Sequence, residues 1–164
     1  MGRKALVTYG SKRGSTAEIA ERIGETIRQK GWLVDVLDAR TVNDVSPYST
    51  IILGSSVYMG RWHKGAVVFL KKNIESLKKL PVWLYISGPT GQGIPMEQMD
   101  GQLYPQSLQP LIKRLNPKAI VCFGGKLALE KLNLLERWII KKVKSPAGDF
   151  RNWEDIKHWA ETIR

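Results

Sequence analysis

KALVTYGSKRGSTAEIA, residues 4–20, is the stretch that decides the fold. Residues 4–9 form a short apolar run of strand-forming side chains, which predicts a buried strand. A polar, glycine-bounded turn follows at residues 10–14. Beyond it the hydrophobic residues recur every three or four positions, as they do on one face of a helix. The stretch therefore predicts a strand, a tight turn and a helix in succession.

The turn has the composition of an anion site. Ser15 and Glu18 match the S-x-x-E capping box, so we expect the helix to begin at Ser15. The free N–H groups and the positive dipole end of a helix N-terminus point toward one place. Around that place the sequence sets hydroxyl groups, a glycine and two cations: Ser11, Lys12, Arg13, Gly14, Ser15 and Thr16. We expect these residues to bind a phosphate; the alternative is a plain turn that binds nothing.

Two well-known phosphate-binding motifs do not match this turn. The P-loop requires G-x-x-x-x-G-K-[ST], but Gly10 and Gly14 stand too close together and no Lys follows Gly14. The dinucleotide fingerprint G-x-G-x-x-G is absent from the turn as well. If the turn binds phosphate, it therefore does so by another arrangement.

The rest of the chain alternates apolar runs with helical patterns. Further strands are predicted at residues 32–37, 50–53, 81–86 and 118–123, and further helices at residues 64–77, 106–115 and 153–163. Such short apolar strands are typical of a parallel sheet that helices cover on both faces. We expect a single α/β domain over residues 1–164, a three-layer α/β/α sandwich. Its five-stranded parallel sheet is expected to have the order 2-1-3-4-5.

The chain is strongly basic, with 26 Lys and Arg against 15 acidic residues and a formal net charge of +11. Such a charge favours anionic partners, and a merely soluble basic surface is the alternative. No nucleic-acid motif accompanies the charge, and the cations are spread over several predicted helices, so nucleic acid is not the expected partner. Cys122 is the single cysteine, which excludes an internal disulfide, and no group of side chains has metal-binding spacing.

The sequence also bears on localisation. It enters its first predicted strand at Lys4, so we expect no signal peptide. No apolar run approaches the roughly 20 residues that span a bilayer. Together with the lone cysteine, these features predict a cytoplasmic protein.

Three loops of unusual composition follow the first, third and fourth predicted strands. In the order 2-1-3-4-5 these loops are neighbours at the carboxyl edge of the sheet, where open parallel sheets bind ligands. The second loop, residues 54–62, has small residues that let a flat ring approach, and Tyr58, Met59 and Trp62 to stack on it. The third, residues 87–93, is rich in glycine. Together the loops predict a phosphorylated ligand that carries a planar aromatic group.

The sequence resembles the flavodoxin family along nearly its whole length. The resemblance is carried by TYGSKRGST, ILGSSVYMG and YISGPTGQG, which follow the same three strands. It implies a flavodoxin-like fold that binds FMN, with the phosphate on residues 11–16. It further implies that the isoalloxazine ring is flanked by Ser55, Ser56, Val57, Tyr58, Met59 and Gly60, and by Ser87, Gly88, Pro89, Thr90 and Gly91. Whether Tyr58 or Trp62 stacks on the ring stays open.

Within that family the chain is most similar to the menaquinone-dependent, flavodoxin-like protoporphyrinogen oxidase branch. Gly54, Ser56, Gly60 and His63 fit the pattern G-x-S-x-x-x-G-x-x-H. This resemblance implies an oxidoreductase that passes electrons from a substrate through FMN to a quinone or similar acceptor. The alternatives are a flavodoxin-type carrier that exchanges electrons with a redox partner protein, and a basic binding domain without redox function.

His63 is the one candidate for a catalytic side chain. An imidazole near the flavin or a substrate could donate a proton. Its place just before the helix predicted at residues 64–77 also fits a helix cap or a solvent-facing residue. The sequence leaves both interpretations open.

A basic amphipathic segment follows the fifth strand, at about residues 126–148. Its cations over residues 126–144 outnumber its acids, with Lys126, Lys131, Arg137, Lys141, Lys142 and Lys144 against Glu130 and Glu136. Its apolar residues can form one helix face: Leu132, Leu135, Trp138, Ile139 and Val143. We expect this helix either to dock on anionic lipid, at the inner face of the membrane, or on a partner, or to pack on its own domain.

The charges next to the loops bear on the redox potential of a bound flavin. Lys12, Arg13, Arg61 and Lys64 lie in or beside the first two loops. Cations favour the reduced flavin, which is usually an anion at neutral pH. We therefore expect a less negative potential than an acidic flavodoxin would have.

Overall fold

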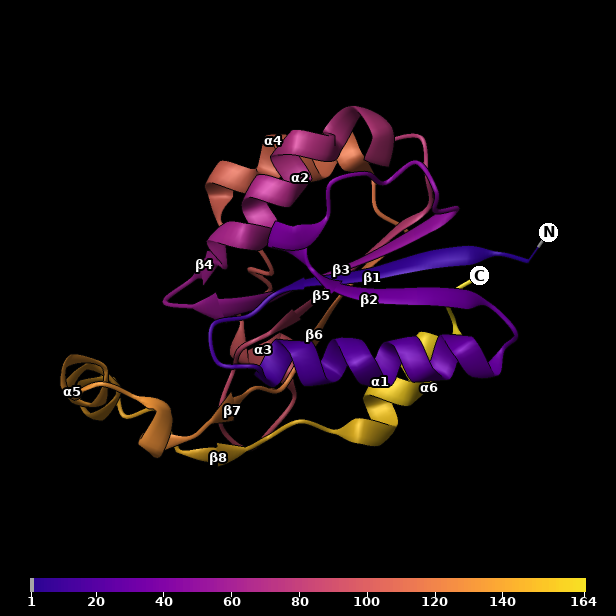
Figure 1. The fold of residues 1–164 in the computed structure, drawn as a ribbon. Helices are drawn as coiled ribbons and strands as arrows, with labels where there is room; N and C mark the ends of the chain where they lie inside the picture. The colour runs from indigo at the N-terminus through magenta and orange to yellow at the C-terminus, as the bar shows by residue number, and fades with distance from the viewer. Residues whose placement is uncertain (1) are drawn as a thin grey trace.

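The computed structural model describes residues 2–164 and contains a central parallel sheet (Figure 1). Its order is β2-β1-β3-β5-β6, and every neighbouring pair is parallel. The strands are β1 (Lys4–Gly10), β2 (Leu33–Asp38), β3 (Thr50–Tyr58), β5 (Val82–Ser87) and β6 (Ala119–Phe123). Because β4 (Arg61–Trp62) only forms a hairpin with the end of β3, this is the predicted order 2-1-3-4-5, which is confirmed.

Helices cover both faces of the sheet, as Figure 1 shows. On one face lie α2 (Lys64–Leu77) and α4 (Gln109–Leu115), and on the other lie α1 (Ser15–Gln29) and α6 (Trp153–Glu161). The connections contain single turns: η1 (Ala39–Thr41), α3 (Pro95–Gln98), η2 (Gln106–Leu108) and η3 (Leu129–Lys131). The predicted α/β/α sandwich is therefore correct, and helix α2 has the predicted bounds.

The segment after β6 leaves the three layers. Two short strands, β7 (Lys126–Leu127) and β8 (Gly148–Asp149), pair antiparallel at its base. Between them α5 (Leu134–Lys142) lies apart from the sandwich in Figure 1. No helix within residues 2–164 is long and apolar enough to cross a membrane.

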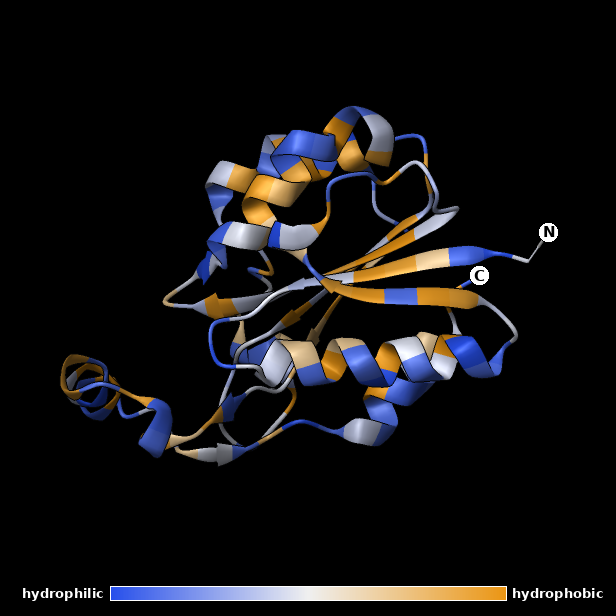
Figure 2. Cartoon of the chain, in the orientation of Figure 1, coloured by the Kyte–Doolittle hydropathy of each residue, from blue (hydrophilic) through white to orange (hydrophobic). Residues whose placement is uncertain are grey.

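Two cores fill the spaces between the sheet and its helices. Along β1, Leu6 faces the α2 and α4 side, whereas Ala5 and Val7 face the α1 and α6 side, because side chains alternate along a strand. The sheet strands are accordingly apolar in Figure 2, and the helices carry apolar stripes. Ile156 and Ala160 bury α6 against the second core, as the helical spacing predicted.

The loop predicted at residues 54–62 is largely a hairpin. Strand β3 continues to Tyr58, and Met59 and Gly60 form its turn with φ values of 50° and 72°. Positive φ at both central residues is the signature of a type I′ turn, which matches the twist of a two-residue hairpin. The hairpin went unpredicted because Met rarely adopts a left-handed conformation.

The start of α1 also differs from its prediction in one detail. The helix begins at Ser15 as expected, but the residue that caps it is Gly14, at φ 89°, and no side chain within residues 2–164 caps the helix. The S-x-x-E capping box was therefore wrong. The Ser11 hydroxyl accepts a hydrogen bond from the Gly14 N–H instead, at 3.0 Å.

Candidate functional site

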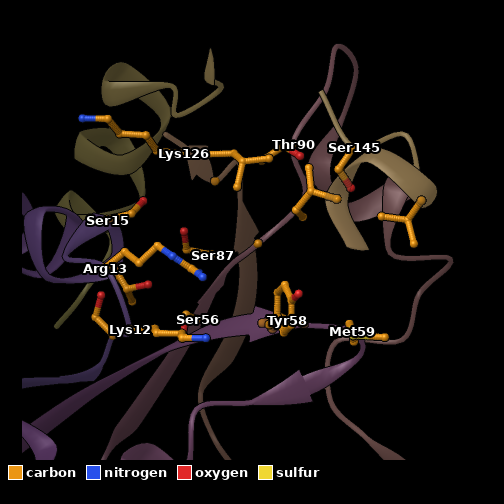
Figure 3. Close-up of a pocket in the computed structure, with 18 of the residues that line it drawn as sticks. Lys12, Arg13, Ser15, Ser56, Tyr58, Met59, Ser87, Thr90, Lys126 and Ser145 are labelled. Carbon is orange, nitrogen blue, oxygen red and sulfur yellow. The ribbon is translucent and has the colours of Figure 1, made fainter. Parts of the chain in front are cut away.

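A cavity of about 520 Å³ opens at the carboxyl ends of the sheet strands (Figure 3). Its volume lies within the range of ligand pockets in proteins. The three predicted loops meet in it and contribute Ser11, Lys12, Arg13, Ser15, Thr16, Ser56, Val57, Tyr58, Met59, Ser87, Gly88 and Thr90. The convergence of these loops, expected from the strand order, is thus present in the structure.

The loop after β1 presents polar groups that the chain does not satisfy. The Ser15 hydroxyl is buried and has no hydrogen-bond partner among the described residues. Thr16 is buried beside it, and both residues belong to the first turn of α1, whose N–H groups lack carbonyl partners within the helix. An unpartnered hydroxyl at a helix N-terminus suits an anionic oxygen acceptor.

The two cations of this loop already have a partner. Lys12 forms an ion pair with Glu136 of α5, and Arg13 Nη2 lies 2.6 Å from the same carboxylate oxygen. The other oxygen of Glu136 accepts from the Asn133 N–H at 3.1 Å and so closes the N-terminal cap of α5. Hydrogen bonds from Lys12, from the Asn133 backbone and from Arg13 lower the pKa of Glu136 to about 2.

These ion pairs change the electrostatic prediction made from the sequence. Lys12 and Arg13 share one carboxylate, so their combined field at the cavity is weaker than two free cations would give. Lys64 lines a different cavity, beside α2. The expectation of a raised redox potential therefore depends on Glu136 as well as on the cations.

Of the two aromatic side chains proposed to stack on a flavin, only Tyr58 lines the cavity. Figure 3 shows Lys12 extending toward Tyr58, and the Lys12 Nζ atom lies 5.6 Å from the centre of the ring. The Tyr58 hydroxyl is buried without a partner in the described part of the chain. Trp62 is instead part of the core, where its Nε1–H donates to the Leu103 carbonyl at 2.9 Å.

Several other residues of the predicted site lie beside the cavity rather than in its lining. Ser55 is fully buried, and its hydroxyl accepts from the His63 N–H at 2.9 Å. Gly60 and Pro89 line an adjoining cavity of about 430 Å³. Gly14 and Gly91 adopt positive φ in the two turns. These residues shape the loops around the cavity.

His63 is the N-cap of α2 in the structure. Its Nδ1 accepts a hydrogen bond from the Gly65 N–H at 3.1 Å. Burial, followed by the nearby charge of Arg40, lowers its pKa. It lines the cavity beside α2 and not the one where the three loops meet, so the geometry supports the capping interpretation.

One side of the cavity was not predicted from the sequence. Beyond β6 the chain contributes Gly125, Lys126 and Leu127, and the segment around α5 contributes Ile139, Ile140, Val143 and Ser145. The glycine pair at the end of the fifth predicted strand was the available signal, because it lies at the same sheet edge as the three loops. A Cβ on Gly125 would stand 2.8 Å from the Gly88 carbonyl oxygen, so these two loops touch.

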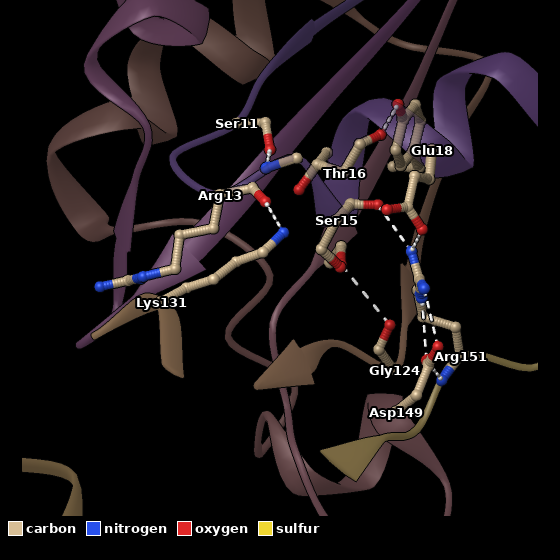
Figure 4. A network of polar contacts seen from close by, with 12 residues as sticks. Ser11, Arg13, Ser15, Thr16, Glu18, Gly124, Lys131, Asp149 and Arg151 are labelled. Carbon is tan, nitrogen blue, oxygen red and sulfur yellow. Dashed lines mark hydrogen bonds and ion pairs between the residues drawn. The ribbon is translucent and has the colours of Figure 1, made fainter. Parts of the chain in front are cut away.

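Arg151 ties the C-terminal segment to the first turn of α1 (Figure 4). Its side chain is only 2% exposed. One guanidinium nitrogen lies 2.6 Å from Glu18 and donates to the Ser15 carbonyl at 3.2 Å, and another lies 2.7 Å from Asp149. Glu18, which the sequence placed in a capping box, is therefore part of this network.

We expect Arg151→Leu to lower the free energy of unfolding by about 2–3 kcal/mol at neutral pH, since charge-assisted hydrogen bonds of a buried side chain are lost. Arg151 lowers the pKa of Asp149 below its ordinary value of 3.8. This contribution is therefore present above that value and lost as the pH falls through the lower folded pKa. Urea unfolding at neutral and acidic pH measures the difference.

The matched control for Arg151 is Arg22→Leu. Arg22 lies on α1 and makes an ion pair of 3.9 Å with the exposed Glu25. Exposed pairs of this kind contribute about 1 kcal/mol or less. Equal losses for the two variants, or a loss for Arg151→Leu that does not shrink in acid, would contradict the role assigned to the buried guanidinium.

Fold and cavity together define a class of protein: a parallel α/β domain with a cavity at the carboxyl edge of its sheet, which is where open parallel sheets bind ligands. The flavodoxin domain model matches residues 6–153, and the chain belongs to the flavodoxin family. Among curated proteins it is similar to protoporphyrinogen IX dehydrogenase [quinone] of Escherichia coli K12. The two are 19% identical over 98% of this chain and 94% of that protein.

Solved structures give the same fold. An archaeal flavodoxin is 17% identical with a TM-score of 0.59, covering 96% of this chain and 99% of its own. Flavodoxin 2 of Bacillus cereus is 19% identical with a TM-score of 0.59, covering 96% and 95%. Rubredoxin oxygen:oxidoreductase of Desulfovibrio gigas is 14% identical with a TM-score of 0.63. The aligned part covers 98% of this chain but only 35% of that longer protein.

Proposed function

We propose that this protein binds FMN in the cavity where the three loops meet. In our proposal it is an oxidoreductase that passes electrons from a substrate to a quinone or a similar acceptor. The observation that carries the proposal is one cavity that brings together two buried hydroxyls without a partner among the described residues: that of Ser15 at the start of α1 and that of the half-buried Tyr58. Membership of the flavodoxin family supports the cofactor. Full-length similarity to a quinone-linked protoporphyrinogen IX dehydrogenase supports the reaction class.

The residues present fit FMN. The buried Ser15 hydroxyl lacks a partner within the described chain, and a phosphate oxygen would accept its hydrogen bond. The buried Tyr58 hydroxyl likewise has no hydrogen-bond partner among the described residues, so the ligand or a water would complete its hydrogen bonding. A Cβ on Gly88 would stand 3.0 Å from the Val57 Cβ, so the loop after β5 packs closely on the end of β3, and both segments line the cavity.

In this proposal, Ser11, Ser15 and Thr16 hold the phosphate, while Tyr58 and the loop after β5 orient the ring. When bound, FMN supplies the electron-transfer chemistry, and the chain supplies binding and electrostatics. Ile139, Ile140 and Val143 line the cavity from the α5 side and make that wall apolar. The described residues that line the cavity include no carboxylate and no imidazole, so its charged lining groups are the cations of Lys12, Arg13 and Lys126.

One observation favours an oxidoreductase over a carrier. The adjoining cavity of about 430 Å³ shares Val57, Met59, Gly88 and Thr90 with the first, so it would place a small molecule against the ligand. Its lining includes side chains that are able to donate and accept hydrogen bonds, among them Gln98, Gln102 and Tyr104. A carrier exchanges electrons with a docked redox partner protein and needs no such second cavity.

The test begins with the purified protein. We expect a flavin absorbance spectrum, and one FMN per chain after reconstitution. The reduced protein should then be reoxidised by a soluble quinone under anaerobic conditions. Failure to bind FMN would contradict the whole proposal and leave the basic binding domain as the alternative. FMN binding without quinone reoxidation, together with electron exchange with a redox protein, would support the carrier.

A further inference from the structure

The outer face of α5 is an exposed surface on which apolar side chains cluster. We define it by Leu134, Leu135, Trp138, Lys141 and Lys142. Leu134 is 84% exposed, Leu135 65% and Trp138 58%. Apolar and charged residues meet along α5 in Figure 2, and the helix lies apart from the sandwich. Large apolar side chains that are clustered and exposed in this way indicate an interaction site.

This exposure does not come from a loosely attached helix. Glu136 and Ile140 are four residues apart and share the opposite side of α5. Glu136 makes the ion pairs with the loop after β1, and Ile140 is buried and lines the cavity. The capping box of Asn133 and Glu136 fixes the start of the helix. The inner side of α5 is therefore fixed to the domain, and its outer face is directed away from the domain.

The structure also corrects the face expected from the sequence. Leu132 precedes the helix and is buried, while Ile139 and Val143 line the cavity, Val143 at its edge with 56% of its surface exposed. Of the predicted face, Leu135 and Trp138 are exposed, and Leu134 joins them. The segment thus does both things that the sequence left open: its inner side packs on the domain and its outer face is available.

The charges around the outer face indicate the partner. Lys141 and Lys142 lie on it, and the Lys142 ammonium is 4.8 Å from the centre of the Trp138 ring. Arg137 and Lys144 are exposed next to it, and Glu136, the acid of this helix, is taken up by Lys12 and Arg13. Leu and Trp flanked by free cations are typical of helices that lie in the interface of an anionic bilayer.

We propose that the outer face of α5 docks on the surface of an anionic lipid bilayer. Leu134, Leu135 and Trp138 enter the interface, while Lys141 and Lys142 reach the headgroups with their apolar stems along the helix. The attachment is peripheral and reversible, because one short helix buries little area. This proposal does not depend on the bound cofactor.

Flotation of the full-length protein with vesicles tests it. Vesicles of phosphatidylcholine with phosphatidylglycerol should bind the protein, vesicles of phosphatidylcholine alone should not, and added salt should weaken binding. Lys141→Gln with Lys142→Gln should weaken binding about 25-fold, since each cation near an anionic surface contributes roughly a factor of five. The matched control is Lys71→Gln with Lys72→Gln on α2, which should retain the affinity.

A second set of variants tests the apolar side chains. Leu134→Ser with Leu135→Ser and Trp138→Ser should abolish flotation without changing the melting temperature, because all three are exposed. Val68→Ser, at a position on α2 that is 51% exposed, should change nothing. The proposal is overturned if wild-type protein does not float with anionic vesicles, or if the α2 variants lose binding equally. A dimer that the triple variant dissociates, without vesicle binding, would assign the face to a second copy.

Discussion

Replacing Ser15 with Ala and Thr16 with Val should weaken FMN binding at least about 100-fold and riboflavin binding less than threefold. Only FMN carries the phosphate, and each hydrogen bond to a charged group contributes about 1.5–3 kcal/mol. The Ser15 hydroxyl is buried without a partner in the described chain, so the wild-type site gains a bond that the variant cannot form. Fluorescence titration of the apoprotein with both flavins measures the ratio.

Ser145→Ala is the control for this experiment. Ser145 lines the same cavity from the α5 side, away from the loop after β1, so its loss should change both affinities little. Ser11 is a less suitable residue to substitute in this test than the sequence suggested. Its hydroxyl already accepts a hydrogen bond from the Gly14 N–H and shapes the loop. Equal losses for FMN and riboflavin in the double variant would show that the phosphate lies elsewhere.

Glu136→Gln should tighten FMN binding about tenfold and raise the midpoint potential of the bound flavin by tens of millivolts. The carboxylate neutralises the loop cations and repels a phosphate. Two unit charges about 8 Å apart at an effective dielectric constant of about 20 interact by roughly 2 kcal/mol before salt screening. For one electron about 1.4 kcal/mol corresponds to 59 mV. The glutamine keeps an oxygen for the Asn133 N–H, so the cap of α5 survives.

The measurement belongs well above the Glu136 pKa of about 2, where the wild-type carboxylate is fully charged. Glu130→Gln is the matched control, because Glu130 is an exposed acid of the same segment that lines a different cavity. Both quantities are read on the intact protein, affinity by titration and potential with reference dyes. An unchanged affinity and an unchanged potential would mean that Glu136 and the loop cations act only to hold α5.

The sheet could be predicted from the sequence because its signals are local. Each buried strand is a short apolar run, and the turn after β1 is marked by its own glycines and hydroxyls. Strand order then placed three distant loops at one edge without any contact being known. Tyr58 could not be separated from Trp62 in this way, since both follow the same strand. The hairpin turn at Met59 and Gly60 places Tyr58 in the lining of the cavity and Trp62 in the core.

The features that escaped prediction are pairings between residues far apart in the sequence. Arg151 meets Glu18 across more than a hundred residues, and nothing in the spacing of either indicates the other. The same holds for Glu136 with Lys12 and Arg13. The cavity wall formed by α5 was missed for a related reason. The helix is short, and both of its sides carry apolar residues, so periodicity alone could not tell the inner side from the outer.

Because α5 contributes to both the cavity and the proposed bilayer-binding face, ligand binding and bilayer binding can be coupled through this helix. Glu136 pairs with Lys12 and Arg13 and would compete with a bound phosphate for them, and the same helix presents Trp138 and its flanking residues outward. If filling the cavity shifts the helix, it changes the bilayer affinity by some factor. By reciprocity of linked equilibria, attachment to the bilayer then changes the ligand affinity by that same factor. Occupancy of each site would thus change the binding affinity of the other through this one short helix.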